Sequence, residues 1–203
     1  MDGNGKRMIY YEHVIIPSVM EELLNTHDCK NISISGLKAD STVDGPGVRY
    51  VVWTQGCDAN CQGCHNPETH HIPTFPRVHT VQEILDDISK NKSVISGLTI
   101  SGGEPFLQPL AIYNLITLFK NEYPDKSVII YTGKLIEDLW ASDDAAVFML
   151  ATKADFIIDG PYDYKSPVSP KDNRRFIGSL NQRVIDVKSS DAINGIIVEL
   201  EDL

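Results

Sequence analysis

The alternation of strand-like and helix-like runs is the feature that most constrains how this chain folds. Short apolar runs rich in β-branched residues are predicted as strands, at 95–101, 127–131, 154–159 and 183–187. Apolar residues at helical spacing lie between them, at 81–90, 110–120, 135–140 and 145–151. Strands and helices in turn are typical of βα units, so the sequence predicts an α/β fold with a largely parallel sheet.

The first part of the chain differs from this pattern. Two strands are predicted at 32–36 and 48–54, separated by the turn sequence Asp44-Gly45-Pro46-Gly47. Residues 18–26 have the pattern of a short helix, and Thr80 is a candidate N-cap for the helix at 81–90. The 203 residues suffice for one domain with a sizeable core. We expect an N-terminal extension over 1–30, of no assigned role, and one domain over 31–203.

Composition narrows the classes of partner. The formal net charge is −10, whereas nucleic-acid-binding proteins usually present a basic face, so we expect no nucleic-acid partner. The chain contains no apolar run near the roughly 20 residues that span a bilayer, which predicts no membrane partner. Its first residues lack the apolar core of a signal peptide, so a cytoplasmic location is expected.

Cys57, Cys61 and Cys64 form a C-x3-C-x2-C cluster, which indicates a metal centre rather than a disulfide framework. An iron–sulfur cluster can use three cysteines and leave one iron open. Zinc is the alternative, because structural zinc sites have similar spacings. A zinc ion would need a fourth ligand, for which the chain offers His65, His70, His71 and Cys29. Cys29 lies 28 residues upstream of Cys57, and we interpret it as an inert thiol.

Four segments directly follow predicted strands: the cysteine loop, 102–104, 132–133 and 160–161. In parallel sheets the functional loops lie beyond the carboxyl ends of the strands. We therefore expect all four segments to meet at one edge of the sheet. Taken alone, the glycine pair at 102–103 is equally compatible with an ordinary turn.

Two of these segments carry a family resemblance. The cysteine spacing resembles the signature of the radical S-adenosylmethionine (SAM) superfamily, and Ser101-Gly102-Gly103-Glu104-Pro105 resembles its second motif. The resemblance implies an incomplete parallel β/α barrel. It also implies a 4Fe–4S cluster held by Cys57, Cys61 and Cys64, with SAM as the second cofactor.

Further motifs are similar to those of the activating enzymes of anaerobic ribonucleotide reductases. They occur in the same order, at Val43–Arg49, Gly63–Thr69, Gly102–Gln108, Tyr131–Gly133, Asp159–Pro161 and Arg175–Asp186. The closing segment departs from the subfamily pattern at Leu180, where a small polar residue is usual.

The resemblance also implies roles for individual residues. Gly102, Gly103 and Glu104 correspond to contacts with the methionine end of SAM. Gly63 and His65, which flank Cys64, are expected to lie against its adenosine. Thr132 and Asp159 are candidates for further SAM contacts, with simple turn roles as the alternative.

The implied activity is reductive cleavage of SAM with an electron from a low-potential donor. The 5′-deoxyadenosyl radical so formed takes a hydrogen from a glycine of the large catalytic subunit of an anaerobic ribonucleotide reductase, which becomes a glycyl-radical protein. One alternative is an activator of another glycyl-radical enzyme or a small-molecule radical SAM enzyme. Many other activators carry an inserted domain with additional cysteines, and this chain has none after Cys64. Another alternative, a non-catalytic zinc or cluster module, leaves 102–105 unexplained.

Overall fold

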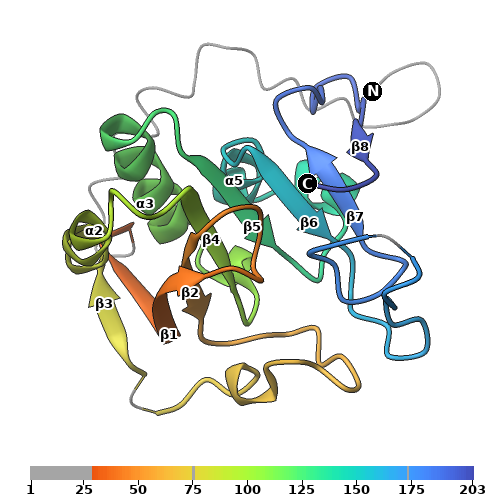
Figure 1. Cartoon of the computed structure of the whole chain (residues 1–203), viewed down its shortest axis with the longest axis horizontal. Coiled ribbons are helices and arrows are strands. Elements are labelled where there is room, and N and C mark those ends of the chain that lie inside the picture. Colours follow the sequence, from red (N-terminus) through yellow and green to blue (C-terminus); the bar gives the residue numbers. More distant parts are fainter. Residues whose placement is uncertain (1–28, 75, 173) are drawn as a thin grey trace.

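The computed structural model describes residues 29–203 except 75 and 173. The helix predicted at 18–26 lies outside the described residues. One eight-stranded sheet organises the chain, in the order β3-β1-β2-β4-β5-β6-β7-β8, which can be followed across Figure 1. The strands are β1 (Asn31–Ser41), β2 (Arg49–Thr54), β3 (Val78–Thr80), β4 (Gly97–Gly102), β5 (Ser127–Tyr131), β6 (Phe156–Asp159), β7 (Arg183–Asp186) and β8 (Glu199–Leu200).

The centre of the sheet is parallel and its two sides are antiparallel. Strands β2, β4, β5 and β6 pair in parallel, whereas β1 and β3 on one side and β7 and β8 on the other pair antiparallel. Since β3 and β8 are its outer strands, the sheet is open. The predicted α/β fold with an incomplete parallel barrel is confirmed. The antiparallel strands on both sides of the sheet were not part of the prediction. The outer strands β3 and β8, of three and two residues, are too short to show a sequence period.

The helices match their predicted positions closely. They are α2 (Val81–Lys90), α3 (Pro109–Glu122), α4 (Ile136–Trp140) and α5 (Ala145–Ala151), with 3-10 turns η2 (Pro67–Thr69) and η3 (Pro105–Leu107). Thr80 caps α2 as expected: its Oγ1 accepts from the Glu83 N–H, and the Glu83 carboxylate accepts from the Thr80 N–H, a capping box. Among the described residues, no helix has the length and apolarity to cross a membrane.

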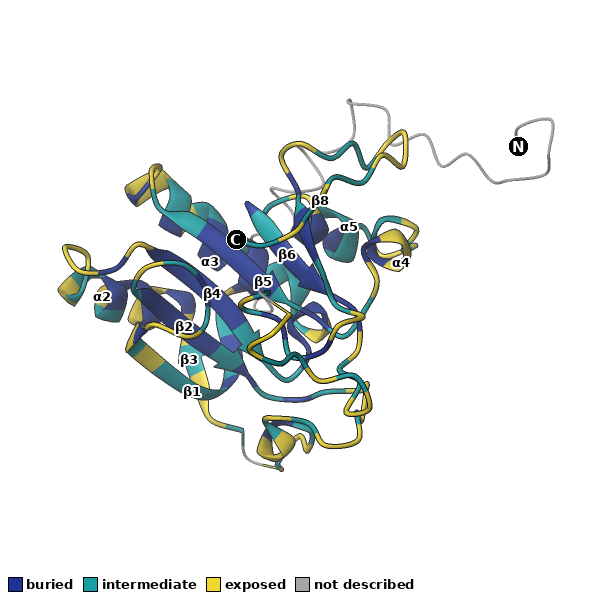
Figure 2. Cartoon of the chain, turned by 45° about the vertical axis from the view of Figure 1, so that its right-hand side comes forward, coloured by how far each residue is buried: buried dark blue, intermediate teal, exposed yellow. Residues whose placement is uncertain are grey.

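The two faces of the sheet bury different partners. On β5, Val128 and Ile130 belong to the large core shared with the helices, whereas Ile129 belongs to a smaller core with Ile158 and Ile177. Side chains alternate across a strand, so these two sets mark opposite faces. Figure 2 shows the buried residues concentrated in the central strands and on the inner sides of the helices. The second face is thus covered in part by the chain around Ile177.

A buried arginine at the start of β2 links three neighbouring strands of the sheet. Arg49 has 0% of its surface exposed, and its guanidinium donates to Thr99 Oγ1 at 3.0 Å, Ser127 Oγ at 2.7 Å and the Leu98 carbonyl at 2.6 Å. Burial lowers the pKa of Arg49 to about 10. A Cβ on Gly97 would lie 2.3 Å from Arg49 Nη1, so glycine is needed there for the guanidinium to fit. This arginine therefore ties β2 to β4 and β5.

Candidate active site

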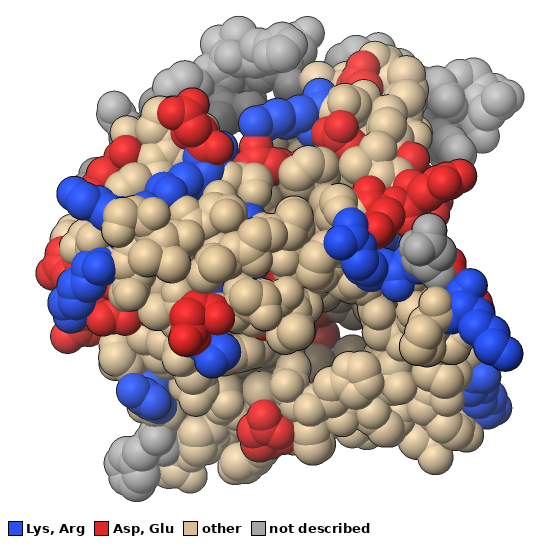
Figure 3. All heavy atoms as spheres, in the orientation of Figure 1, with Lys and Arg blue, Asp and Glu red and all other residues tan. Residues whose placement is uncertain are grey.

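The four segments predicted to converge line one cavity of about 460 Å³ at the carboxyl ends of the parallel strands. The convergence expected from the sequence is confirmed. Figure 3 shows the face of Figure 1 hollowed, with mostly uncharged side chains around the hollow. Strand ends contribute Trp53, Ser101, Gly102, Gly103, Tyr131, Thr132, Gly133 and Gly160, and the cysteine loop contributes Cys57, Ala59, Cys61, Cys64, His65, Asn66 and His70.

One side of the cavity, here called the cysteine wall, comprises residues 56–70 and 102–104. The loop folds back on itself: the Gly56 N–H donates to the Thr69 carbonyl at 2.8 Å, and the buried Thr69 hydroxyl donates to the Asn66 carbonyl at 2.7 Å. Asn60 turns the chain between Cys57 and Cys61 with φ +46°, a left-handed conformation that asparagine tolerates better than most residues. These bonds hold the three cysteines on one wall.

The three thiols form a donor set suited to iron. Cys57, Cys61 and Cys64 are half-buried and free of disulfides. Burial raises the pKa of the Cys57 thiol, and the Glu104 carboxylate adds to this, against opposing backbone N–H groups of Ala59 and Asn60. A thiolate at this position is therefore costly until a metal cation offsets its charge.

The surroundings of the thiols suit a cluster. Three soft thiolates on one wall, with open cavity in front of them, fit an iron–sulfur cluster that binds one cysteine per iron. Within the described ranges, no three His, Cys, Asp or Glu side chains are grouped as ligands of a single metal ion.

The glycine pair packs directly against the start of the cysteine loop. Gly102 has φ +102°, and a Cβ there would lie 2.5 Å from the Thr54 backbone nitrogen. A Cβ on Gly103 would lie 2.1 Å from the Gly56 carbonyl oxygen. The Gly103 N–H donates to the Thr54 carbonyl at 2.9 Å, and the Glu104 N–H to the Gly56 carbonyl at 2.8 Å. The pair is therefore more than an ordinary turn, because it positions the start of the cysteine loop against the end of β4.

Glu104 connects the ends of β4 and β5 from inside the protein. Only 1% of its surface is exposed, and its carboxylate accepts from the Thr132 hydroxyl at 2.9 Å, the Gly133 N–H at 3.0 Å and the Phe106 N–H at 3.0 Å. Burial raises the pKa of Glu104. Glu104 does not line the cavity, whereas Thr132 and Gly133, which it orients, do.

Another side of the cavity, here called the C-terminal wall, comprises residues 160–172 and 174–182. Its main brace is Gln182, whose Oε1 accepts from the N–H groups of Gly178 at 2.8 Å and Ser179 at 3.2 Å. The Gln182 Nε2 donates to the Gly160 carbonyl at 3.1 Å, which ties the two ends of the wall together. Phe176 adopts φ +65°, a strained conformation for an aromatic residue, on the cavity side of this wall.

The two walls touch through His65. Its ring lies 4.6 Å from the ring of Tyr162, measured between centroids. A Cβ on Gly178 would lie 3.3 Å from His65 Cε1 and 3.1 Å from Tyr162 Cδ2. Gly63, with φ +72°, leaves room for Tyr164, since its Cβ would lie 3.2 Å from that of Tyr164. The residue after the third cysteine thus contacts the C-terminal wall as well as the cavity.

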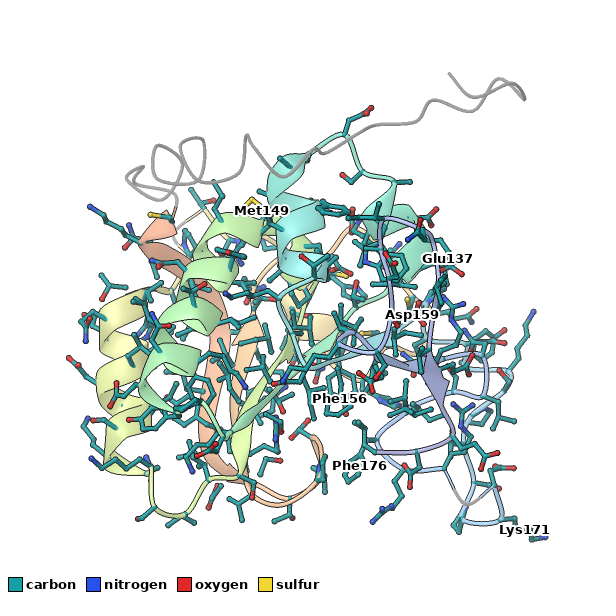
Figure 4. The ribbon with its side chains drawn as sticks, turned by 90° about the horizontal axis from the view of Figure 1, so that it is seen from above. Glu137, Met149, Phe156, Asp159, Lys171 and Phe176 are labelled. Carbon is teal, nitrogen blue, oxygen red and sulfur yellow. The ribbon has the colours of Figure 1, made fainter. Side chains whose placement is uncertain are left out.

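Asp159 lies behind this wall in an ion-pair network. It is fully buried, and its carboxylate accepts from Arg183 Nη2 at 2.5 Å and from the Ile136 N–H at 2.9 Å. Arg183 also pairs with Glu137, and Figure 4 labels the two carboxylates that flank it. Hydrogen bonding to Arg183 lowers the pKa of Glu137, and the two carboxylates raise the pKa of Arg183. This arrangement fixes the start of β7 against α4.

Not every predicted site residue reaches the cavity. Those that line it are Cys57, Cys61, Cys64, His65, Gly102, Gly103 and Thr132. Gly63, Glu104 and Asp159 are not among the lining residues. Sequence reasoning assigned no role to Tyr131, Tyr162, Gly178 or Gln182, which also line the cavity. The signal was available for three of them, because Tyr131, Gly178 and Gln182 lie inside motifs that resemble the activating enzymes.

Residues 43–185 match the family described as "4Fe-4S single cluster domain". The chain is 34% identical over 147 residues to the anaerobic ribonucleoside-triphosphate reductase-activating protein of Enterobacteria phage T4, covering 70% of this chain and 86% of that protein. It is 40% identical over 91 residues to the pyruvate formate-lyase-activating enzyme of Listeria monocytogenes, covering 43% of this chain and 36% of that enzyme. The chain thus spans about a third of the length of that second relative.

Among solved structures, the crystal structure of QueE from Escherichia coli matches with a TM-score of 0.37 and 18% identity. The match covers 51% of this chain and 52% of that chain.

Proposed function

This chain belongs to the radical SAM enzymes with a single 4Fe–4S cluster domain, within the family of the glycyl-radical activating proteins, and we propose that it activates an anaerobic ribonucleotide reductase. Its substrate is then a glycine residue in the large catalytic subunit of that reductase. The electron comes from a low-potential donor protein. We assign residues 31–203 to the cluster domain, and residues 1–30 to an N-terminal extension of unknown role.

The cavity carries this proposal. Three thiols and a glycine pair approach the same space from neighbouring loops, and the space is open to the surface. When bound, the reduced cluster would supply one electron to the sulfonium of SAM, whose C–S bond would break to give methionine and a 5′-deoxyadenosyl radical able to abstract a hydrogen atom. The protein must hold both cofactors, exclude water from them and leave an entrance for a loop of the partner. The open sheet is compatible with such an entrance, because its outer strands β3 and β8 do not pair with each other.

Individual residues then have defined tasks. Cys57, Cys61 and Cys64 hold the cluster. Gly102 and Gly103 form the floor against which the methionine end of SAM lies. Glu104 acts at this floor through the groups it binds, since its carboxylate is committed to Thr132, Gly133 and Phe106. It is a positioning residue in this proposal.

The adenosine end of SAM is assigned to the other side of the cavity. His65 faces the cavity there beside the Tyr162 ring and is the candidate contact. Gly63 acts by letting the chain turn after Cys61, with φ +72°. Asp159 supports the wall through Arg183 rather than from within the cavity lining.

A second candidate is the activation of a different glycyl-radical enzyme. The similarity to pyruvate formate-lyase-activating enzymes favours it, although that similarity covers 91 residues. The phage T4 protein matches over 147 residues, and this longer match supports the reductase as partner.

The test is anaerobic reconstitution with iron and sulfide, reduction in the presence of SAM, and an assay for 5′-deoxyadenosine. We expect cleavage by the wild type and none by Cys61→Ala, with Cys29→Ala as the matched control that retains activity. Addition of a purified anaerobic ribonucleotide reductase should produce a glycyl-radical electron paramagnetic resonance (EPR) signal, and pyruvate formate-lyase should give none. A protein that binds zinc and never cleaves SAM would refute the proposal.

A further inference from the structure

His70 carries a buried nitrogen that the fold leaves without a partner. Among the described residues, three buried side-chain nitrogen or oxygen atoms have no hydrogen-bond partner: Ser33 Oγ, His70 Nε2 and Trp140 Nε1. Of these three residues, only His70 lines the cavity. Buried polar atoms in native proteins are nearly always paired, so one beside a cofactor site points to a partner in the cofactor. His70 is half-buried, whereas the neighbouring His71 is exposed.

The backbone of His70 is anchored to the first cysteine. Its N–H donates to the Pro67 carbonyl at 3.2 Å, and its carbonyl accepts from the Cys57 N–H at 3.4 Å. The preceding residue is held in the same way, since the Thr69 carbonyl accepts from the Gly56 N–H at 2.8 Å. The imidazole therefore extends from a segment that runs alongside Cys57.

We propose that His70 donates its Nε2–H to a sulfur of the cluster held by Cys57, Cys61 and Cys64, and so raises the reduction potential of that cluster. This inference rests on the proposed function. A neutral imidazole can carry its proton on Nε2, and the thiolate and sulfide sulfurs of a cluster are hydrogen-bond acceptors. The reduced cluster carries one more negative charge than the oxidised cluster, so a donor at sulfur stabilises the reduced form more.

The other histidines of the loop lack this combination. His65 lines the cavity, but its ring packs on Tyr162 and it has no buried unpaired atom. His71 is exposed and does not line the cavity. His71 is therefore the matched control: it is the same residue type, one position along the chain, without access to the cofactor.

The experiment compares His70→Phe, His70→Gln and His71→Phe in the full chain, reconstituted without oxygen. Iron and sulfide content is measured first, and the midpoint potential of the cluster is then measured without SAM by a redox titration followed by EPR. We expect all variants to retain the cluster. The potential of His70→Phe should shift to a more negative value, and that of His71→Phe should equal the wild-type value. His70→Gln should lie between them, because the glutamine Nε2 reaches a position close to that of the histidine Nε2.

Equal potentials in His70→Phe and His71→Phe would overturn the inference. Loss of iron from His70→Phe but not from His71→Phe would overturn it too, since His70 would then be a ligand. If His70→Phe does not fold, His70→Met takes its place, because methionine is similar in length to glutamine but has no donor. Failure of the wild type to assemble any cluster counts against the proposed function itself, so the two failures are distinguishable.

Discussion

The cysteine wall and the C-terminal wall face the same cavity but are held by different kinds of bond. The two parts of the cysteine wall are joined to each other and to the end of β2 by main-chain contacts, in which Gly103 and Glu104 donate to carbonyls of Thr54 and Gly56. The C-terminal wall is braced by side-chain amides: Gln182 bonds both of its ends, and Asn181 Nδ2 donates to the Pro161 carbonyl at 2.8 Å. The close approach at Gly103 leaves no room for a Cβ beside the Gly56 carbonyl, so glycine is required at that position. The side-chain hydrogen bonds of the C-terminal wall instead depend on the amide groups of individual residues, and another side chain with a donor and an acceptor could in principle make them.

The largest loss of stability is expected for a substitution at the start of β7, next to the C-terminal wall. Arg183→Met leaves the fully buried Asp159 without its ion-pair partner, and unpairing a buried charge costs about 3–5 kcal/mol of the free energy of unfolding. Urea denaturation measures this loss. Glu137→Gln removes the exposed partner of the same arginine and should cost less than about 1 kcal/mol. Similar losses in the two variants would mean that Asp159 is solvated.

The next effect tests the main-chain construction of the cysteine wall. Gly103→Ala places a Cβ 2.1 Å from the Gly56 carbonyl oxygen, a backbone atom that cannot move aside without shifting Cys57. We expect a loss of up to about 3 kcal/mol in the free energy of unfolding, together with reduced iron uptake on reconstitution. Gly133→Ala is the control, because its nearest contact is the Ala59 side chain at 3.3 Å. Full iron loading of Gly103→Ala would contradict the role given to this contact.

A smaller loss of stability is expected in the C-terminal wall, and it tests whether SAM binding and cluster binding depend on different walls. Gln182→Leu leaves the N–H groups of Gly178 and the buried Ser179 without their acceptor, at a cost of about 1–2 kcal/mol. Because the cysteine wall is not involved, iron content should stay at the wild-type level while SAM binding weakens, as equilibrium dialysis would show. Asn181→Ala, which removes one exposed brace, is the control. Loss of iron in Gln182→Leu would show that the walls are not independent.

The smallest effect concerns the contact that joins the walls. Tyr162→Leu removes the ring contact with His65, worth about 0.5–1 kcal/mol in stability. We expect nearly unchanged thermal unfolding and a weaker affinity for SAM, measured on the reconstituted protein. Tyr164→Leu is the matched control, since Tyr164 is 42% exposed and does not line the cavity. Equal SAM affinity in both variants would remove Tyr162 from the site.

Much of the fold was predictable because periodic burial leaves a trace in the sequence. The helix at 81–90 was predicted with its cap, and the strand at 127–131 with its bounds, because apolar spacing and capping residues are local signals. The pairing of β3 was not predictable, since its three residues are too few to show a period. The full length of β1 was also missed, because its second half is mostly half-exposed and contains register shifts.

The same distinction between local signals and long-range contacts applies to the functional site. The sequence by itself determined the metal-binding loop and the glycine pair, because three thiols at short spacing and two adjacent glycines can be recognised without knowledge of the fold. Only the tertiary structure decided which residues face the cavity. Glu104 and Asp159 are buried among donors from distant segments, and His70 keeps an unpaired nitrogen next to the cysteines. Contacts between residues far apart in the chain have no local signature, so the same residue types in the sequence are compatible with any of these environments.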